Sequence, residues 1–185
     1  MMRLHRRLLV DHRGDAAVDF AIFAPVLLLL FVGITDIGRG LYLHFRLAAA
    51  ANAAGAYAMT MASKVESTDG AALAASLAGL ARSDNGVSVS NVAVSVNNGP
   101  TATASGTSAA VQGGSAAAAD LCWCPSAAPF AWGTSVSCSG SCSIGVATPG
   151  KFVTISISQV FTPLFSAYGI VASGPMVVNV TVQVA

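Results

Sequence analysis

The sequence predicts an α+β fold in which one long N-terminal transmembrane helix extends into a small exported domain with an antiparallel sheet and a disulfide loop. An uncharged apolar run lies near the N-terminus, alternating valine and isoleucine segments occupy the second half, and four cysteines lie in a stretch rich in Gly, Ser and Pro. Helix-forming sequence first and strand-forming sequence later is typical of α+β domains, in which a helix covers one face of an antiparallel sheet.

The composition excludes several classes of protein. Charged residues make up only 9% of the 185-residue chain and apolar types 54%, which is too apolar for an ordinary soluble surface. Much of the excess is alanine, which buries little area, so we expect a thin core. The net charge of +1 gives no reason to expect a nucleic-acid partner.

Residues 1–14 form a basic leader. Four of the nine Lys and Arg residues fall in this segment. Positive charges favour the cytoplasmic side of a membrane. We therefore expect the N-terminus inside the cell and the C-terminal body across the membrane.

An uncharged run from Phe20 to Thr35 follows the leader. As a helix it spans roughly 24 Å, short of the roughly 30 Å hydrocarbon core, so the span is expected to include residues 16–18 as well. This places Asp19 just inside the cytoplasmic edge, where a carboxylate either reaches the headgroups or needs a partner. Pro25 lies within the run, and membrane helices tolerate proline better than soluble helices do.

The helix is expected to continue beyond the membrane, over residues 15–62. A secretory signal would be cut after its apolar core, whereas here the run leads without a break into an alanine-rich stretch that has no proline. Such a helix is roughly 70 Å long, and small side chains allow close approach between helices. The long helix is therefore suited to packing beside copies or relatives, or else to lifting a domain off the membrane.

Residues 63–185 are predicted to form the exported α+β domain. Asp69 can cap a helix over Gly70–Ser83, whose three leucines share one face, with Gly86 just after its end. Valines alternate with small or polar residues over Val87–Val96, but the alternation shifts by one residue partway along. This predicts a strand with a bulge near Asn91. Asn97–Pro100 predicts a turn.

The low-complexity segment 101–119 contains almost only Ala, Ser, Thr and Gly. It predicts one weak strand around Ala109–Gln112 and a flexible remainder. Alternating residues then predict strands around Val153–Ile157 and Val178–Val184, joined by an apolar loop or short helix at Phe161–Pro175. We expect the sheet to pack on the outer half of the long helix.

The cysteine loop, residues 122–142, contains Cys122, Cys124, Cys138 and Cys142. An even count in an exported segment favours disulfides, for which three pairings exist. We favour two bridges from the first pair to the second, because the Cys-Trp-Cys spacing suits neither a local bridge nor a zinc site. The loop also contains aromatic side chains that form either a small core or an exposed contact patch: Trp123, Phe130 and Trp132.

The sequence gives little support for an enzymatic activity. Of the three histidines, His5 and His12 lie in the leader and His44 on the long helix, away from any serine, cysteine or carboxylate pair of the exported domain. No Gly-rich phosphate loop follows a strand, and exported carboxylates are few. We expect no catalytic activity, no metal, no cofactor and no small-molecule substrate.

The segment Arg6–Tyr42 resembles the N-terminus of TadE-like proteins, the pseudopilins of the tight-adherence (Tad, Flp-type) pilus. The family pattern is an Arg-rich leader, a Gly, small residues, an acidic residue with an aromatic, Ala-Pro, a leucine-rich run and Gly-Arg. The resemblance implies cleavage between Gly14 and Asp15 by a membrane-bound prepilin peptidase. It also implies that subunit assembly involves Asp19, Phe20 and Pro25, with Asp19 where the family usually has Glu.

The leading hypothesis is a minor pseudopilin that acts in pilus assembly and surface adhesion. Its partners would be the membrane, the prepilin peptidase, other pilin or pseudopilin subunits and the pilus assembly platform. It would be a single-pass protein of the bacterial inner membrane, reaching the cell surface within a pilus. The alternatives are an uncleaved anchor that displays a binding or adhesive domain and, with least support, a hydrolase domain on a stalk.

Overall fold

The computed structural model describes residues 15–84, 91–106, 108, 110–126, 130–142, 148–166, 169 and 171–185. The basic leader with Gly14, and residues 87–90 of the expected first strand, lie outside this part. The chain divides into two compact units. Unit 1 comprises Met1–Leu41 and Thr162–Ser173, and unit 2 comprises Tyr42–Phe161 and Gly174–Ala185.

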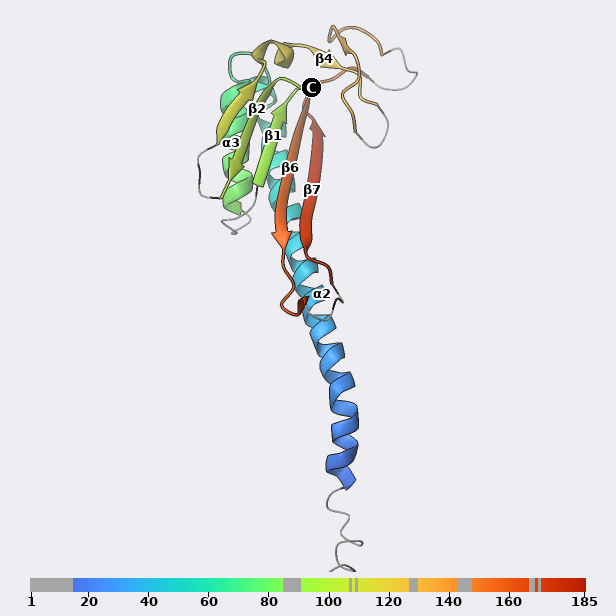
Figure 1. Cartoon of the computed structure of the whole chain (residues 1–185). Coiled ribbons are helices and arrows are strands. Elements are labelled where there is room, and N and C mark those ends of the chain that lie inside the picture. Colours follow the sequence, from blue (N-terminus) through green and yellow to red (C-terminus); the bar gives the residue numbers. More distant parts are fainter. Residues whose placement is uncertain are drawn as a thin grey trace, which may run out of the picture. The chain divides into compact units, whose positions relative to one another are not determined.

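The predicted long helix is present as α2, Asp15–Thr60, with 46 residues (Figure 1). It continues through Pro25, although a proline removes one helical backbone donor. The run of apolar and alanine residues supplies strong helix formers on both sides of the proline. After Thr60 the chain turns through a short 3₁₀ helix, η2, at Ala62–Lys64.

Unit 2 contains the predicted antiparallel sheet, and all its neighbouring strands are antiparallel. Among the described residues the strand order is β3-β2-β1-β6-β7, which Figure 1 shows as neighbouring arrows from yellow-green to red. The strands are β1 Asn91–Val96, β2 Pro100–Ser105, β3 Val111–Gly114, β6 Phe152–Phe161 and β7 Gly174–Gln183.

Alternation of side chains assigns one face of this sheet to the core. The valines of β1 at 92, 94 and 96 are buried, as are Val153, Ile155 and Ile157 of β6. The second helix, α3 at Gly70–Asp84, packs on β1 and β2 and buries Leu73 and Leu77 in the same core. The outer half of α2 contributes mostly small residues to this core: Leu47, Ala50, Ala51, Ala54 and Ala58.

The low-complexity segment 101–119 is more ordered than its composition suggests, so the prediction of a flexible remainder was wrong. It contributes most of β2, all of β3, and most of η3 at Ala116–Asp120. Alternation within β2 buries Ala102 and Ala104 on the side covered by α3. Small residues suit this position because they let the helix approach the strand closely. The weak strand expected around Ala109–Gln112 begins two residues later, at Val111.

The predicted turn joins β1 to β2. Asn97 and Asn98 both have positive φ, 52° and 55°, a conformation that asparagine tolerates better than most residues. The Gly99 N–H donates to the Val96 carbonyl at 2.9 Å and closes the turn. The pairing of β1 with both neighbours is regular from Asn91 onward, and the bulge expected near Asn91 falls at the boundary of the described residues.

Gly55 marks the close approach of α2 to β7. A Cβ at this position would lie 3.2 Å from Cγ1 of Val182 and 3.3 Å from Cγ1 of Val180. A Cβ at Gly79, in the middle of α3, would meet nothing within 4 Å. The two glycines are thus a matched pair, one against the sheet and one beside open space.

We expect Gly55→Leu to lower the free energy of unfolding of unit 2 by about 1–3 kcal/mol, because the added side chain overpacks the α2–β7 contact. Gly79→Leu is expected to leave it unchanged or raise it by up to about 1 kcal/mol, because leucine favours helix. Urea unfolding of the detergent-solubilised protein, followed by circular dichroism, measures both. Equal midpoints for the two variants would contradict the packing described here.

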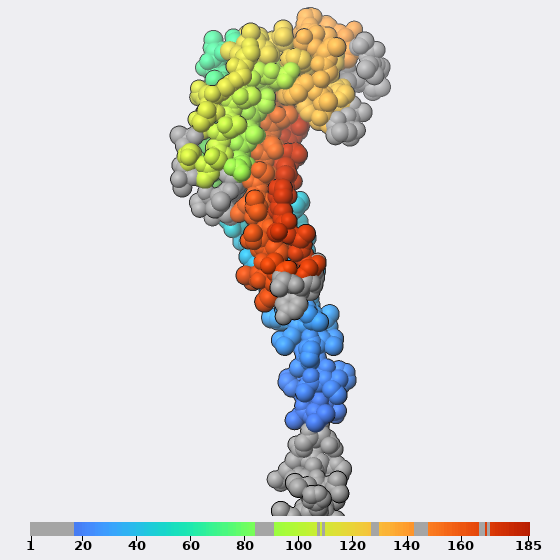
Figure 2. Space-filling view, in the orientation of Figure 1, coloured from blue at the N-terminus to red at the C-terminus, as the bar shows by residue number. Residues whose placement is uncertain are grey.

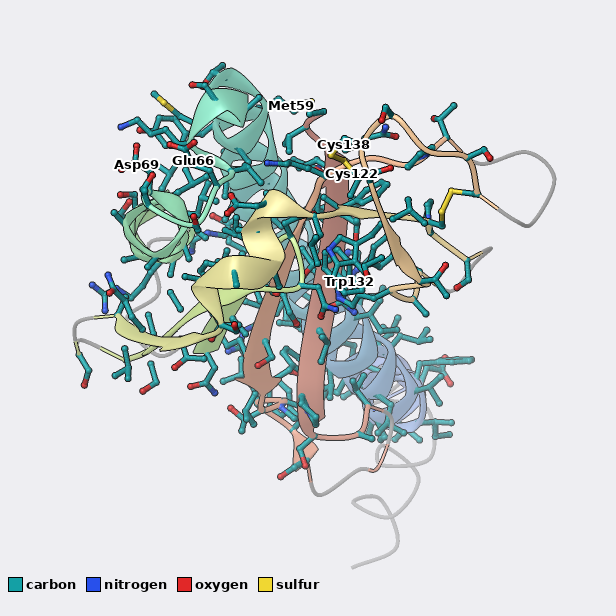
Figure 3. The ribbon with its side chains drawn as sticks, turned by 90° about the horizontal axis from the view of Figure 1, so that it is seen from above. Met59, Glu66, Asp69, Cys122, Trp132 and Cys138 are labelled. Carbon is teal, nitrogen blue, oxygen red and sulfur yellow. A yellow bond between two sulfur atoms is a disulfide. The ribbon has the colours of Figure 1, made fainter. Side chains whose placement is uncertain are left out.

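The cysteine loop forms a second, two-stranded sheet in unit 2. It consists of β4 Cys122–Trp123 and β5 Ser135–Val136, and the fold contains two disulfides, Cys122–Cys138 and Cys124–Cys142 (Figure 3). Each joins one cysteine of the first pair to one of the second. For sequence separations of 16 and 18, each bridge is worth about 3 kcal/mol, chiefly by restricting the unfolded chain.

The aromatic residues of the cysteine loop pack on one another. The ring centroids of Trp123 and Trp132 are 5.8 Å apart, those of Phe130 and Trp132 5.1 Å, and those of Phe130 and Phe152 of β6 5.6 Å. The first two pairs are edge-to-face and the third is tilted, and aromatic pairs at such distances are stabilising. The cluster therefore acts as a small satellite core that ties the cysteine loop to the main sheet, although Phe130 and Trp132 remain half-buried.

Candidate functional site

The first part of α2 in unit 1 exposes apolar side chains all round its circumference. Phe20 is 67% exposed, Leu28 64% and Phe31 70%. Figure 2 shows this part of α2 in blue. A helix that is apolar on every side is stable only when something covers it, either protein or lipid. The other exposed large apolar residues of this surface are Val18, Ile22, Phe23, Val26, Leu27, Leu29, Leu30, Ile34 and Ile37.

This helix is the only one among the described residues that is long and apolar enough to cross a membrane. The most apolar stretch of 18 residues in this helix has a mean hydropathy of 2.5, and only 6% of that stretch is buried inside the protein. A core helix of a soluble protein would be mostly buried. The low burial therefore favours the membrane over a protein core as the environment of this helix.

The three predicted assembly residues lie on this exposed segment. Asp19, Phe20 and Pro25 are all exposed, and Asp15 is the first residue of the helix. Within the described part of the chain no basic group forms an ion pair with Asp19. The carboxylate of Asp19 is thus placed on an apolar helix one turn from the helix start, without an ionic partner among those residues.

The same helix carries a shallow apolar groove about two to five turns beyond Asp19. Its floor includes Gly33, which is buried although the helix around it is mostly exposed. A glycine on a helix face lets a second helix approach closely. The lining residues are Val26, Leu29, Leu30, Gly33, Ile34 and Ile37.

Asp36 is a second acidic residue of unit 1, and sequence reasoning did not single it out. It is 2% exposed, and its carboxylate accepts hydrogen bonds from the backbone N–H groups of Leu164 at 2.8 Å and Phe165 at 3.1 Å. Arg39, one turn further along the helix, lies 3.7 Å from the same carboxylate. Asp36 thereby ties the loop between β6 and β7 to the helix.

Asn97 is the main polar anchor of unit 2. It is fully buried; its side-chain Nδ2 donates to the carbonyls of Ala119 at 2.9 Å and Leu121 at 2.6 Å, and its Oδ1 accepts from the Phe152 N–H at 3.2 Å. Its backbone carbonyl accepts a hydrogen bond from Trp123 Nε1 at 3.1 Å. One residue therefore joins the β1–β2 turn, η3, the cysteine loop and β6.

Asp120, at the end of η3, anchors the segment between the two helices. Its carboxylate accepts a hydrogen bond from the Ser67 N–H at 2.9 Å. Hydrogen bonding from the side chain and backbone of Ser67 holds the pKa of Asp120 below its usual value, and the positive charge of Lys151 acts in the same direction. Lys151 itself donates to the Val65 carbonyl at 2.6 Å, so both charges serve the structure of unit 2.

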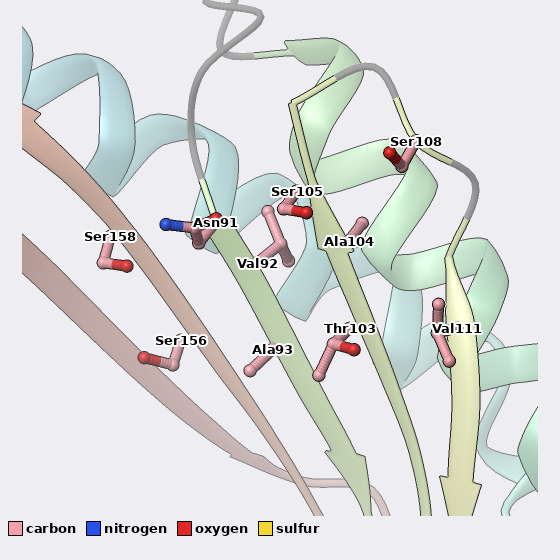
Figure 4. A pocket seen from close by; sticks show the side chains of 10 residues that line it. All are labelled: Asn91, Val92, Ala93, Thr103, Ala104, Ser105, Ser108, Val111, Ser156 and Ser158. Carbon is pink, nitrogen blue, oxygen red and sulfur yellow. The ribbon is translucent and has the colours of Figure 1, made fainter.

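A shallow groove crosses β1, β2 and β6 at one end of the sheet (Figure 4). Its polar lining consists of small hydroxyl and amide side chains, among them Asn91, Thr103, Ser156 and Ser158. None of the described residues that line it is titratable, so these residues supply no general acid or base. Nor do the described residues anywhere hold a group of three or more His, Cys, Asp or Glu side chains suited to a metal ion.

Residues 14–56 match the family model of TadE-like proteins. The match begins at Gly14 and extends through the apolar run into the alanine-rich half of α2, which confirms the predicted resemblance for this part of the chain. No curated protein and no solved structure matches the chain.

Proposed function

We propose that this protein is a minor pseudopilin of a Tad pilus and acts in pilus assembly and surface adhesion. The observation that carries the proposal is the exposed apolar half of α2, with Asp19 on its surface, inside the segment that matches TadE-like proteins. A membrane anchor requires only the apolar surface. A subunit that moves from the membrane into a filament requires both the apolar surface and the carboxylate.

The proposed maturation begins with insertion, with the leader 1–14 in the cytoplasm. A prepilin peptidase then cuts between Gly14 and Asp15. Glycine suits the cut because a residue without a side chain allows the peptide to lie extended in a narrow cleft. Cleavage removes the basic leader and creates a new amino group on Asp15.

Assembly then depends on charge pairing. In an apolar filament core neither a carboxylate nor an ammonium group is stable alone, because burial of an isolated charge is very costly. The Asp19 carboxylate and the free amine of a neighbouring subunit satisfy each other. Aspartate is one methylene shorter than the glutamate usual in TadE-like proteins, so the partner amine must approach the helix more closely than it would for a glutamate.

Unit 2 is the part that the assembly would present outside the membrane. Its two disulfides cross-link the cysteine loop, and the satellite aromatic core packs within it. Phe130 and Trp132 keep part of their surface accessible, which suits a contact with another subunit or with a surface. We assign the adhesive role of the proposed function to this loop.

The alternative is an uncleaved single-pass anchor that displays unit 2 as a binding domain. The low burial of the apolar helix favours membrane insertion in either case. Only the pseudopilin requires processing at Gly14. The two functions are therefore separated by the fate of the leader.

We expect Gly14→Lys to leave a full-length, membrane-bound protein, because a long charged side chain blocks the peptidase cleft. Gel electrophoresis of membrane extracts from cells that contain the prepilin peptidase shows the difference between precursor and mature forms. Arg13→Lys is the matched control, since it keeps the leader's charge and leaves the cut peptide bond unchanged. Normal maturation of Gly14→Lys would contradict the proposal.

A further inference from the structure

Asp36 is in an unusual position for a buried carboxylate. It lies directly after the uncharged run of α2, and its two strongest contacts are backbone N–H groups of a loop 128 and 129 residues further along the chain. Next to water, these N–H groups would need no protein partner. Both are bound by a carboxylate that is itself only 2% exposed, so these two backbone groups are shielded from water although the side chains of the loop are not.

The two residues held by Asp36 present apolar side chains outward. Leu164 is 61% exposed and Phe165 37%. At this point of the loop two backbone N–H groups bind the helix, while the two large apolar side chains keep much of their surface accessible. This is the arrangement that a non-helical segment needs in order to contact lipid, because unsatisfied backbone groups are not tolerated there.

The position of Asp36 along the helix agrees with a membrane boundary. From Phe20 to Asp36 the helix rises roughly 24 Å, so with Asp19 at the inner edge of a hydrocarbon core of roughly 30 Å, Asp36 lies near the outer edge. Arg39, 45% exposed and 3.7 Å from the Asp36 carboxylate, follows one turn later, where long basic side chains reach the headgroups.

We propose that the loop at Leu164 and Phe165 is a second membrane-contacting element, which enters the outer interface of the bilayer and is held against α2 by Asp36. The occupant of this apolar surface is lipid. The helix on either side of Asp36 is apolar and exposed as well, at Ile34 and Ile37. This inference rests on the membrane-spanning role of α2 in the proposed function, but not on cleavage or pilus assembly.

The test uses the full-length Phe165→Trp protein in phosphatidylcholine vesicles whose acyl chains carry bromine close to the headgroup. Bromine quenches only tryptophans that contact lipid at that depth. The wild-type protein supplies the background from Trp123 and Trp132, and Ser139→Trp, at an exposed position of the cysteine loop, controls for an added tryptophan. We expect the emission added by Phe165→Trp to be blue-shifted and largely lost in brominated vesicles, and that added by Ser139→Trp to persist.

The role of Asp36 is tested in the same Phe165→Trp background. Asp36→Ala removes both acceptors, whereas Asp36→Asn keeps one and guards against loss of the fold, which circular dichroism also checks. We expect quenching to decrease in the order Asp, Asn, Ala. Equal quenching in all three would overturn the proposed role of Asp36.

Vesicle flotation separates this inference from the proposed function. If the protein does not float with vesicles, α2 does not span the membrane and both proposals fail. If it floats but the emission added by Phe165→Trp is unquenched, the loop proposal alone fails. If the emission is unquenched and its maximum shifts with protein concentration, Leu164 and Phe165 form a contact between copies of the chain. That result would also overturn the lipid assignment.

Discussion

Replacing Asp19 by alanine is expected to abolish incorporation of the subunit into its assembly while leaving its synthesis and membrane insertion intact. The side chain is exposed on an apolar helix and has no ionic partner among the described residues, so its removal costs the isolated subunit little. In the assembly it would leave the neighbour's amine buried without a counter-charge. Such a penalty is typically about 3–5 kcal/mol, a loss of at least about a hundredfold in association.

Two further substitutions at this position sharpen the result. Asp19→Glu keeps the charge and restores the residue that TadE-like proteins usually carry, so incorporation should match or exceed that of the wild type. Asp19→Asn keeps the size and removes the charge, and it should fail as alanine does. Sheared pilus fractions probed for the subunit provide the measurement, and undiminished incorporation of Asp19→Ala would refute the charge-pairing account.

The largest expected effect on stability is at Asn97. Asn97→Ala removes the side-chain donor to the carbonyls of Ala119 and Leu121 and the acceptor for the Phe152 N–H, all of them in a fully buried position. Buried groups left unsatisfied cost about 1–3 kcal/mol each. We expect the free energy of unfolding of unit 2 to fall by about 2–4 kcal/mol, because part of the penalty is relieved by relaxation.

Asn98 provides the control for this experiment. It has nearly the same positive φ, 55° against 52°, but its side chain is exposed. The backbone cost of placing alanine in this conformation is therefore similar at both positions, and the difference between the two variants reports the hydrogen bonds of Asn97. Equal unfolding midpoints for Asn97→Ala and Asn98→Ala in urea would contradict the anchoring role.

The parts of the fold that could be predicted from sequence are those specified by local pattern. The uninterrupted apolar and alanine-rich run specified α2, and strict alternation specified β6 and β7, because periodicity reports which side of an element is buried. The turn at Asn97–Pro100 followed from residues that accept positive φ. In each case the signal lies within the element itself.

The parts that were missed depend on distant partners. The β2 strand has too few large residues for a clear alternating pattern, and it forms because β1 pairs with it and α3 covers Ala102 and Ala104. Asp36 looked like the end of an apolar run, since the backbone groups that it binds lie 128 and 129 residues away. No local pattern carries such information.

The assembly residues themselves stay predictions. Family resemblance, not periodicity, selected Asp19, Phe20 and Pro25, as it selected the cleavage site at Gly14, and the structure adds that the three assembly residues are exposed on one helical segment. Exposure is what an assembly surface needs, but a lipid-facing helix needs it as well. Whether the leader is removed, leaving Asp15 at the N-terminus, distinguishes an assembly subunit from a lipid-facing anchor.

N-terminal sequencing of the protein extracted from the membranes of its own cells tests the central claim most directly. Cleavage by a prepilin peptidase predicts a single sequence that begins at Asp15 and continues Ala-Ala-Val-Asp. A sequence that begins at Met1 or Met2 would show that the basic leader is retained, and it would contradict the pseudopilin account.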